Sequence, residues 1–301
     1  MPTTILVPSR RGAAALADLP DTELVRFVPS EPLPEQARDG EVMVVRSTDV
    51  DAQLALMSQL PKLRLVQTLT AGIDHWQGRL PDGVALSSAR GAHGASTAEW
   101  AVAALLTVYR ELREFAVEQT QHIWKQRRTD TLVGKRVLVL GAGDLGTHVR
   151  VRLEAFGAEV SMVGRSARPG VHADGEVPEL LPGHDAVVLV LPLAEDTRGS
   201  VDAAFLARMP DGAVLVNAAR GEVVDTAALL AELQARRLRA ALDVTNPEPL
   251  PPSHPLWTAP GVLITPHVAG STYGDDDRAW SVARQQIAAH LAGERPDNLV
   301  G

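Results

Sequence analysis

The chain has 301 residues, 45% of them apolar and 22% charged, and this length predicts two domains rather than one small core. It contains no cysteine, which excludes disulfides, thiolate nucleophiles and cysteine-ligated metal centres and agrees with a cytoplasmic location. The net charge of −8 argues against nucleic-acid binding, and the chain shows neither a secretory signal nor the run of about 18 apolar residues that a membrane span requires.

The first third of the chain alternates short β-like runs with polar or helical segments. This alternation predicts a small parallel α/β domain. Val50–Leu60 has the spacing of a helix, and the expected strands are Thr4–Val7, Leu24–Val28, Glu41–Val45, Leu63–Thr68 and Val84–Ser87.

A single long helix is expected over Ser96–Gln126. Its apolar residues recur at helical spacing, no proline or glycine interrupts it, and Ser96 or Thr97 is placed to cap its N-terminus. Such a helix is suited to packing between two domains.

A second α/β pattern begins at Gly134, with helices expected at Leu145–Phe156 and Thr226–Arg237. Several of its strands are continuous apolar runs, as expected for a parallel sheet that is covered on both faces. These strands are Arg136–Leu140, Val160–Val163, Ala186–Leu191, Ala213–Asn217, Arg239–Val244 and Val262–Thr265.

The last helix, Ala279–Leu291, follows the second domain and is expected to return to the first. The acidic run Asp275–Asp277 is interpreted as the N-terminal end of this helix rather than as a metal site. The predicted domains are therefore residues 1–95 together with 275–301, and residues 96–274.

The strongest local signal is an apolar strand that runs into G-x-G-x-x-G and then into a helix, a context typical of dinucleotide binding. Gly141 permits the tight turn, Gly143 lets the backbone approach a pyrophosphate, and Gly146 lets the helix pack closely on the strand. The free N–H groups and the dipole of the helix N-terminus favour phosphate. The candidate cofactor-binding residues of this loop are Gly141, Gly143, Asp144, Leu145 and Gly146.

The second strand of this domain ends at Val163 without the acidic residue that usually accepts the ribose hydroxyls of NAD. Arg165, Ser166 and Arg168 follow instead, and arginine makes charge-assisted, forked contacts with phosphate. We therefore expect NADP as the preferred cofactor, with NAD possible. In the alternative interpretation, Arg165 stacks on adenine or faces solvent.

Three later segments each place one reactive side chain just after an expected strand, where ligands bind in open α/β sheets. Arg220 follows Val214–Asn217, Glu248 lies between two prolines, and His267 follows Thr265-Pro266. Each has a structural alternative when taken singly, since a lone histidine or loop acid is often structural. Their order downstream of a phosphate loop favours a catalytic set.

With these segments, the chain resembles the D-isomer-specific 2-hydroxyacid dehydrogenase family, which includes glyoxylate/hydroxypyruvate reductases, D-lactate dehydrogenases and phosphoglycerate dehydrogenases. The resemblance is densest from Ala98 to Gly270 and implies two doubly wound α/β domains with parallel sheets: a Rossmann dinucleotide-binding domain and a smaller, flavodoxin-like substrate domain. Further matching pieces are Thr70–Asp74, Ala98-Glu99, Trp124, Leu191–Leu193, Thr197–Gly199 and His254–Trp257.

The resemblance also implies catalytic roles. His267 corresponds to the general acid/base, Glu248 to its carboxylate partner, and Arg220 to the arginine that binds the substrate. Reduction of a ketone develops negative charge on oxygen, which an imidazole proton and a guanidinium are suited to stabilise.

Further residues enter by the same resemblance. Backbone amides of the segment Leu69–Gly72 are expected to bind the substrate carboxylate, with Leu69, Ala71 and Gly72 as candidates. Arg46 follows a strand and is either a substrate ligand or a structural residue. His75, His93 and His254 lack metal-ligand spacing with nearby acids, so no metal is expected. The cofactor site is expected to include Thr97, Leu191, Pro192, Ala218, Asp243 and Gly270; Asp243 either reaches the nicotinamide amide or has a capping role.

The expected function is hydride transfer between NAD(P)H and a small 2-oxo acid or D-2-hydroxy acid, of the glyoxylate/hydroxypyruvate reductase type. The alternative is a dinucleotide-sensing, corepressor-like binding protein on the same fold, since such proteins retain the same three residues. A homodimer is expected because relatives commonly pair through the nucleotide domain and its long helix. No regulatory domain is expected after Asn298.

Overall fold

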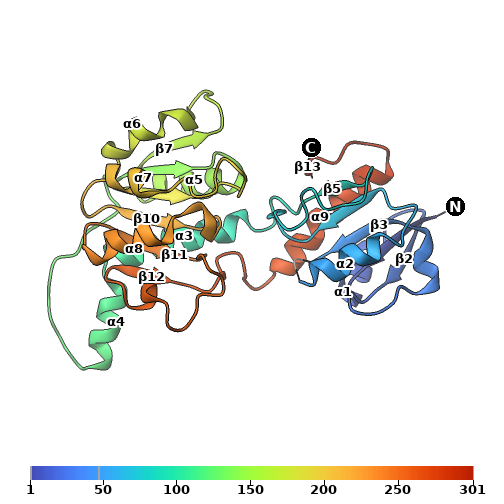
Figure 1. The fold of residues 1–301 in the computed structure, drawn as a ribbon, viewed down its shortest axis with the longest axis horizontal. Coiled ribbons are helices and arrows are strands. Elements are labelled where there is room, and N and C mark those ends of the chain that lie inside the picture. The colour runs from blue at the N-terminus through green and yellow to red at the C-terminus, as the bar shows by residue number, and fades with distance from the viewer. Residues whose placement is uncertain (1, 47, 301) are drawn as a thin grey trace. The chain divides into compact units, whose positions relative to one another are not determined.

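A computed structural model describes residues 2–46 and 48–300, and it divides the chain into two compact units. Unit 1 combines Met1–His93 with Tyr273–Gly301, and unit 2 is Gly94–Thr272 (Figure 1). These boundaries lie two residues from those expected from the sequence. In the described part of the chain, no helix has both the length and the apolar character needed to cross a bilayer.

Unit 1 is built on a six-stranded sheet in the order β13-β5-β4-β3-β1-β2. Its first five strands are parallel and have the flavodoxin-like order 2-1-3-4-5, whereas β13 pairs antiparallel with β5. The strands are β1 (Thr3–Val7), β2 (Thr22–Arg26), β3 (Gly40–Val45), β4 (Leu65–Thr68), β5 (Ala85–Ser87) and β13 (Leu299–Val300).

Both faces of this sheet are covered. Helices α1 (Arg10–Leu16) and α9 (Asp275–Leu291) pack with Ile5, Val7, Val42 and Val44 on one face, while α2 (Val50–Met57) packs with Leu6, Met43 and Val45 on the other. Neighbouring residues of one strand thus enter opposite cores, as the two-residue period of a strand requires. The first turn of α9 contains Asp275–Asp277, as the sequence predicts.

Unit 2 has a seven-stranded sheet in the order β12-β11-β10-β9-β6-β7-β8, and every strand pair in it is parallel. Six strands from β8 to β11 follow the Rossmann order 3-2-1-4-5-6, and β12 extends it. The strands are β6 (Arg136–Leu140), β7 (Glu159–Gly164), β8 (His172–Ala173), β9 (Ala186–Leu189), β10 (Val214–Asn217), β11 (Arg239–Leu242) and β12 (Val262–Ile264).

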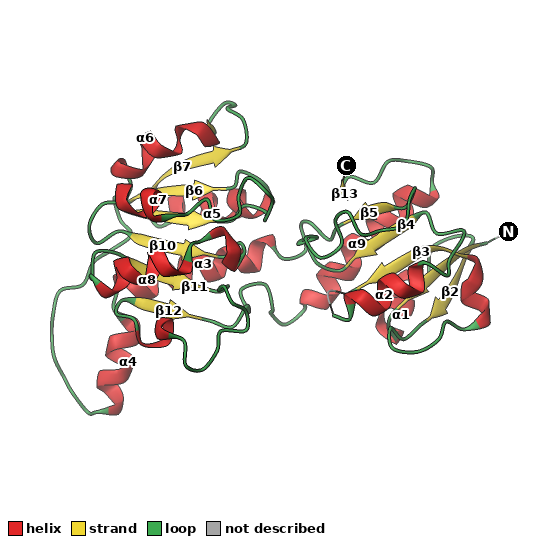
Figure 2. Ribbon diagram, in the orientation of Figure 1, coloured by secondary structure: helices red, strands yellow, loops and turns green. Residues whose placement is uncertain are grey.

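Helices flank this sheet (Figure 2), and the buried apolar side chains form two cores on its opposite sides. Val137 and Val139 of β6 enter the core that α3 and α5 cover, and Leu138 and Leu140 enter the core that α7 and α8 cover. This burial on both faces explains why the strands read as continuous apolar runs. The helices are α3 (Gly94–Tyr109), α5 (Asp144–Ala155), α6 (Val177–Leu180), α7 (Ala203–Arg208) and α8 (Thr226–Gln234).

The prediction of one helix over Ser96–Gln126 is wrong. Helix α3 ends at Tyr109, and α4 (Leu112–Thr120) begins after Glu111, whose backbone is left-handed with φ 51°. The buried stripe of α3 ends at Tyr109, and α4 contains no buried residue, so packing does not hold the two segments in line. Figure 1 shows α4 extending past β12 before the chain returns in a long loop.

The start of α3 also differs from the prediction. The helix begins at Gly94, so Ser96 and Thr97 lie within its first turn rather than at its N-cap. Helix boundaries depend on the local backbone path, which the capping preference of serine and threonine alone does not fix.

Candidate functional site

The carboxyl ends of the strands of unit 2 are joined by backbone hydrogen bonds that continue beyond the strands themselves. The Ala218 N–H donates to Leu189 O at 3.1 Å, the Asp243 N–H to Asn217 O at 3.0 Å, and the Thr265 N–H to Leu242 O at 2.9 Å. The loops that follow β9, β10, β11 and β12 are therefore anchored side by side at one edge of the sheet.

The glycine-rich loop between β6 and α5 lies at this same edge. A Cβ atom on Gly141 would meet Val190 O at 2.5 Å, and one on Gly146 would meet Gly141 O at 1.8 Å, so neither position accepts a side chain. A Cβ on Gly143 would meet nothing within 4 Å. Gly143 is the N-cap of α5, and no side chain caps the first N–H groups of this helix. The open space at this N-cap is suited to an anion. The residues present fit a dinucleotide pyrophosphate.

Beside this loop, the end of β7 presents basic and hydroxyl side chains. Arg165, Ser166 and Arg168 are all exposed, and Arg168 Nη2 donates to Ala142 O of the glycine-rich loop at 2.7 Å. The guanidinium of Arg168 is thus held next to the position where the ribose of a bound dinucleotide would lie.

His267 and Glu248 are brought together from two different loops. His267 Nδ1 lies 2.6 Å from Glu248 Oε1, although the two residues are 19 positions apart in the chain. Glu248 follows β11 and His267 follows β12, which are neighbouring parallel strands. Because Nδ1 faces the carboxylate, Nε2 of His267 is the ring atom that is directed away from it.

The backbone at His267 is left-handed, with φ 54°, a conformation that costs a non-glycine residue about 1 kcal/mol or more. The Asp243 carboxylate compensates this cost. It is 3% exposed and accepts hydrogen bonds from Thr265 Oγ1 at 2.6 Å and from the N–H groups of Val268 and Ala269 at 2.9 Å. These hydrogen bonds give Asp243 a role in fixing the turn around His267.

Arg220 follows β10, the neighbour of β11, and precedes a short 3₁₀ turn at Gly221–Val223. Its Nη1 donates to Ala219 O at 2.8 Å. The buried Asn217 side chain accepts from the Ala219 N–H at 3.0 Å and donates to Arg220 O at 2.9 Å. Asn217 was not predicted as a site residue; an amide closing an otherwise apolar strand is the one signal that marks it in the sequence.

The remaining cofactor candidates lie in the loops at this edge. Leu191 and Pro192 follow β9, Ala218 follows β10, and Gly270 follows the His267 segment. They share the sheet edge with the glycine-rich loop. Gly141 of that loop lies against Val190, the residue that follows β9.

In unit 1, the Leu69–Gly72 segment follows β4 at the carboxyl edge of that sheet. The Leu69 N–H donates to Val45 O at 3.1 Å, and the Leu69 side chain is 5% exposed in the core. Thr70 Oγ1 donates to Gly72 O at 2.9 Å and fixes the turn. The side chain of Leu69 therefore lies in the core, and its N–H is engaged by β3.

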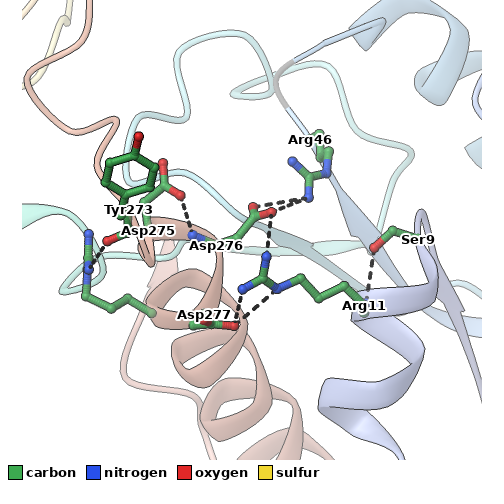
Figure 3. Close-up of polar contacts among 9 residues, drawn as sticks. Ser9, Arg11, Arg46, Tyr273, Asp275, Asp276 and Asp277 are labelled. Atoms are coloured by element: carbon green, nitrogen blue, oxygen red, sulfur yellow. Dashed lines mark hydrogen bonds and ion pairs between the residues drawn. The ribbon is translucent and has the colours of Figure 1, made fainter.

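Arg46 follows β3 at the same edge and is held on two sides. The fully buried Gln53 side chain accepts from the Arg46 N–H at 3.2 Å and donates to its carbonyl at 3.0 Å. Arg46 Nη2 lies 3.2 Å from Asp276 Oδ1 at the start of α9, and Asp276 also faces Arg11 (Figure 3). Arg46 thus forms an ion pair with Asp276.

Acidic and histidine side chains do not assemble into a metal centre here: over residues 2–46 and 48–300 no group of three or more suitable ligands occurs.

Residues 102–269, more than half of the chain, match the model of the D-isomer specific 2-hydroxyacid dehydrogenase, NAD binding domain. The chain is 32% identical over 303 residues to the glyoxylate reductase/hydroxypyruvate reductase of Mus musculus, a match that covers 94% of this chain and 92% of the relative.

Two solved structures are also similar. One is a D-isomer specific 2-hydroxyacid dehydrogenase from Xanthobacter autotrophicus Py2 in complex with NADPH and MES, with a TM-score of 0.87, 29% identity and coverage of 100% of this chain and 98% of that one. The other is an NADPH-dependent glyoxylate/hydroxypyruvate reductase from Sinorhizobium meliloti in complex with NADP and sulfate, with a TM-score of 0.83, 30% identity and the same coverage.

Proposed function

The chain belongs to the D-isomer-specific 2-hydroxyacid dehydrogenase family and is an NAD(P)-dependent oxidoreductase acting on CH–OH donors, and from this premise we propose that it reduces small 2-oxo acids of the glyoxylate and hydroxypyruvate class. The observation that carries the proposal is the His267–Glu248 pair, joined at 2.6 Å on the sheet edge that also holds the glycine-rich loop. An acid/base side chain beside a dinucleotide site is the minimum that ketone reduction requires.

The glycine-rich loop would hold the pyrophosphate, and Arg165, Ser166 and Arg168 would hold a 2′-phosphate. The exposed position of all three at the end of β7 and the placement of Arg168 on Ala142 O support NADP as the preferred cofactor, with NAD as the second candidate. When bound, the nicotinamide supplies the hydride that reaches the carbonyl carbon.

The side chains of unit 2 account for the remaining chemistry. His267 delivers a proton from Nε2 to the carbonyl oxygen, because Nδ1 is engaged by Glu248. Glu248 orients the ring through its contact with Nδ1. Arg220 binds the carboxylate of the 2-oxo acid and polarises its carbonyl through charge-assisted hydrogen bonds.

The backbone N–H groups of Ala71 and Gly72 would bind the substrate carboxylate as well, whereas the N–H of Leu69 already donates to Val45 O. Support comes from the turn itself, whose side-chain bonds fix the backbone while Ala71 remains exposed. Arg46 enters this proposal as the weaker candidate, since Asp276 already faces its guanidinium.

A homodimer is proposed as the assembly. Support comes from α4 and the loop after it, where Leu112, Val117 and Trp124 are 51%, 51% and 98% exposed. Exposed apolar side chains on a helix that has no buried residue favour an interface with a second copy of this chain. The location in the cytoplasm stays a prediction from the sequence.

The function is tested by following loss of the reduced-nicotinamide absorbance with NADPH and with NADH against glyoxylate, hydroxypyruvate, pyruvate, 2-oxobutyrate and phenylpyruvate. We expect turnover with glyoxylate or hydroxypyruvate and a preference for NADPH. No turnover of any acid by a folded protein that binds the cofactor tightly would contradict the proposal and favour the dinucleotide-sensing alternative, which the similar proteins described above do not support.

A further inference from the structure

A buried amide lies directly beneath the proposed substrate-binding arginine. Asn217 is the last residue of β10, is 1% exposed, and ends the apolar run Val214-Leu215-Val216. A polar side chain in such a place is stable only when its hydrogen bonds are satisfied, because an unpaired buried amide costs about 1–3 kcal/mol. Its contacts therefore indicate what it is there to hold.

The side chain of Asn217 closes the turn that carries Arg220. Its Oδ1 accepts from the Ala219 N–H at 3.0 Å, and its Nδ2 donates to the Arg220 carbonyl at 2.9 Å. Its own carbonyl accepts from the Asp243 N–H at 3.0 Å, which ties the turn to the next strand. Asparagine can make both side-chain bonds, because its short amide carries a donor and an acceptor.

The turn is fixed from its other side by the residue after Arg220. A Cβ on Gly221 would lie 1.9 Å from Thr245 O and 2.1 Å from Thr245 C, so the backbone there is packed directly on the segment that leads to Glu248. Thr226 Oγ1 holds the same segment through Asn246 O at 2.8 Å. The peptide groups on both sides of the Arg220 Cα are thus immobilised.

We propose that Asn217 is a positioning residue for Arg220, which sets the direction in which the guanidinium leaves the backbone and thereby determines substrate affinity. The inference rests on the proposed function, in which Arg220 binds the 2-oxo acid. The Arg220 side chain is long, so a small rotation of the Arg220 peptide group moves the guanidinium further than it moves the backbone. A misplacement of a binding group by about 1 Å costs up to about 10²-fold in rate.

The test compares Asn217→Ala with Asn217→Asp, using glyoxylate and NADPH. The aspartate keeps the acceptor for the Ala219 N–H but has no donor for the Arg220 carbonyl. We expect both variants to lose about 10- to 10²-fold in kcat/KM for glyoxylate, mainly through KM, with the NADPH dissociation constant unchanged. The aspartate variant keeps a bond to the turn and remains available if the alanine variant does not fold.

His184→Ala is the matched control. His184 is also buried in unit 2 and makes two side-chain hydrogen bonds, to Leu180 O at 2.7 Å and Ser161 Oγ at 2.9 Å, but it precedes β9 at the opposite edge of the sheet. It should lower Tm as the Asn217 variants do and leave kcat/KM unchanged. An equal loss of kcat/KM in His184→Ala would show that general destabilisation explains the Asn217 result and would overturn the proposal.

A double-mutant cycle with Arg220→Lys shows whether Asn217 acts through Arg220. Adding Asn217→Ala to Arg220→Lys should change kcat/KM by less than about threefold, because the group being positioned is already altered. Fully multiplicative losses would overturn the positioning role while leaving the function of Arg220 intact. Full activity of Arg220→Lys and Arg220→Ala would instead reject the proposed function, and the inference with it.

Discussion

His267 illustrates how single residues prepare the site. Its left-handed backbone is unfavourable for any side chain with a Cβ, yet the Asp243 carboxylate binds the residues on both sides of it, and the Asp243 carbonyl accepts the His267 N–H at 2.7 Å. Glu248 then fixes the ring. Asp243 and Glu248 thus fix the backbone and the ring of His267 through Nδ1 and the main chain.

Replacing His267 with alanine should reduce kcat/KM for 2-oxo acid reduction by at least about 10²-fold, because the positioned proton donor is lost. The glycine-rich loop is untouched, so NADPH should still bind with its ordinary affinity in a fluorescence titration. Near-normal turnover by a folded His267→Ala protein would reject the assignment.

Replacing Arg165 and Arg168 with alanine should weaken NADPH binding by about tenfold or more per arginine, the range for charge-assisted hydrogen bonds to phosphate. NADH has no 2′-phosphate, so its dissociation constant should change little. The two constants are measured on the same variants, and equal losses for both cofactors would reject a 2′-phosphate site at the end of β7.

The strands and the glycine-rich loop could be predicted from the sequence because their signals are local: continuous apolar runs and glycines at fixed spacing. The break between α3 and α4 could not, because helical spacing continues past Tyr109 while the partner surface stops there. Strand β13 has two residues and depends on pairing with the distant β5. The roles of Gln53 and Asn217 could not be predicted from the sequence, because a buried polar side chain is recognised only when its hydrogen-bond partners are known.

The glycine-rich turn gives a prediction about the element as a whole. Gly146→Ala should destabilise unit 2 by about 1–3 kcal/mol, because the new methyl group would overlap the Gly141 carbonyl. Gly143→Ala is the matched variant: its methyl group meets open space and its φ is −92°, so stability should hold. Thermal unfolding without cofactor compares the two.

The same pair separates stability from binding. NADPH affinity should fall in Gly143→Ala because the methyl group occupies the space into which the first turn of α5 points. If Gly143→Ala keeps full NADPH affinity, the pyrophosphate does not lie against this turn.

Helix α9 carries a pH-dependent contribution to stability near its C-terminal end. Burial lowers the pKa of His290 below its ordinary value of 6.5, with Glu41 opposing the shift. The unfolded chain therefore binds this proton more tightly, and stability is lost as the pH falls below about 6.5. His290→Gln should flatten the fall in Tm between about pH 7 and pH 5, and parallel Tm curves for the two proteins would contradict this account.

At the scale of the whole molecule, the proposed homodimer would be formed through α4 and the loop that follows it. Arg127 of the loop binds Glu111 and Glu118 at α4, and Arg113 Nη1 of α4 donates to Val262 O of β12 at 2.6 Å. The apolar side chains of α4 and this loop are exposed. Such an arrangement keeps the segment ordered while leaving its apolar side chains available to a second copy.

The combined change Val117→Ser with Trp124→Ala should convert the proposed dimer to a monomer in sedimentation velocity, since it removes exposed apolar area from α4 and its loop. Val151→Ser is the control, because Val151 is 56% exposed on α5, outside this segment. A wild-type protein that sediments as a monomer at micromolar concentration would already contradict the dimer.

The chain leaves unit 1 at His93 and returns to it at Tyr273. On the ribosome, all of unit 2 emerges before Trp280, Ala283 and Ile287, the residues of α9 that cover one face of the unit 1 sheet. At synthesis rates of about 5–20 residues per second, the part of that face that α9 covers stays exposed for roughly ten to forty seconds. A nascent chain of this protein thus carries a complete nucleotide-binding unit and an incomplete unit 1, whose apolar residues under α9 stay exposed throughout the interval.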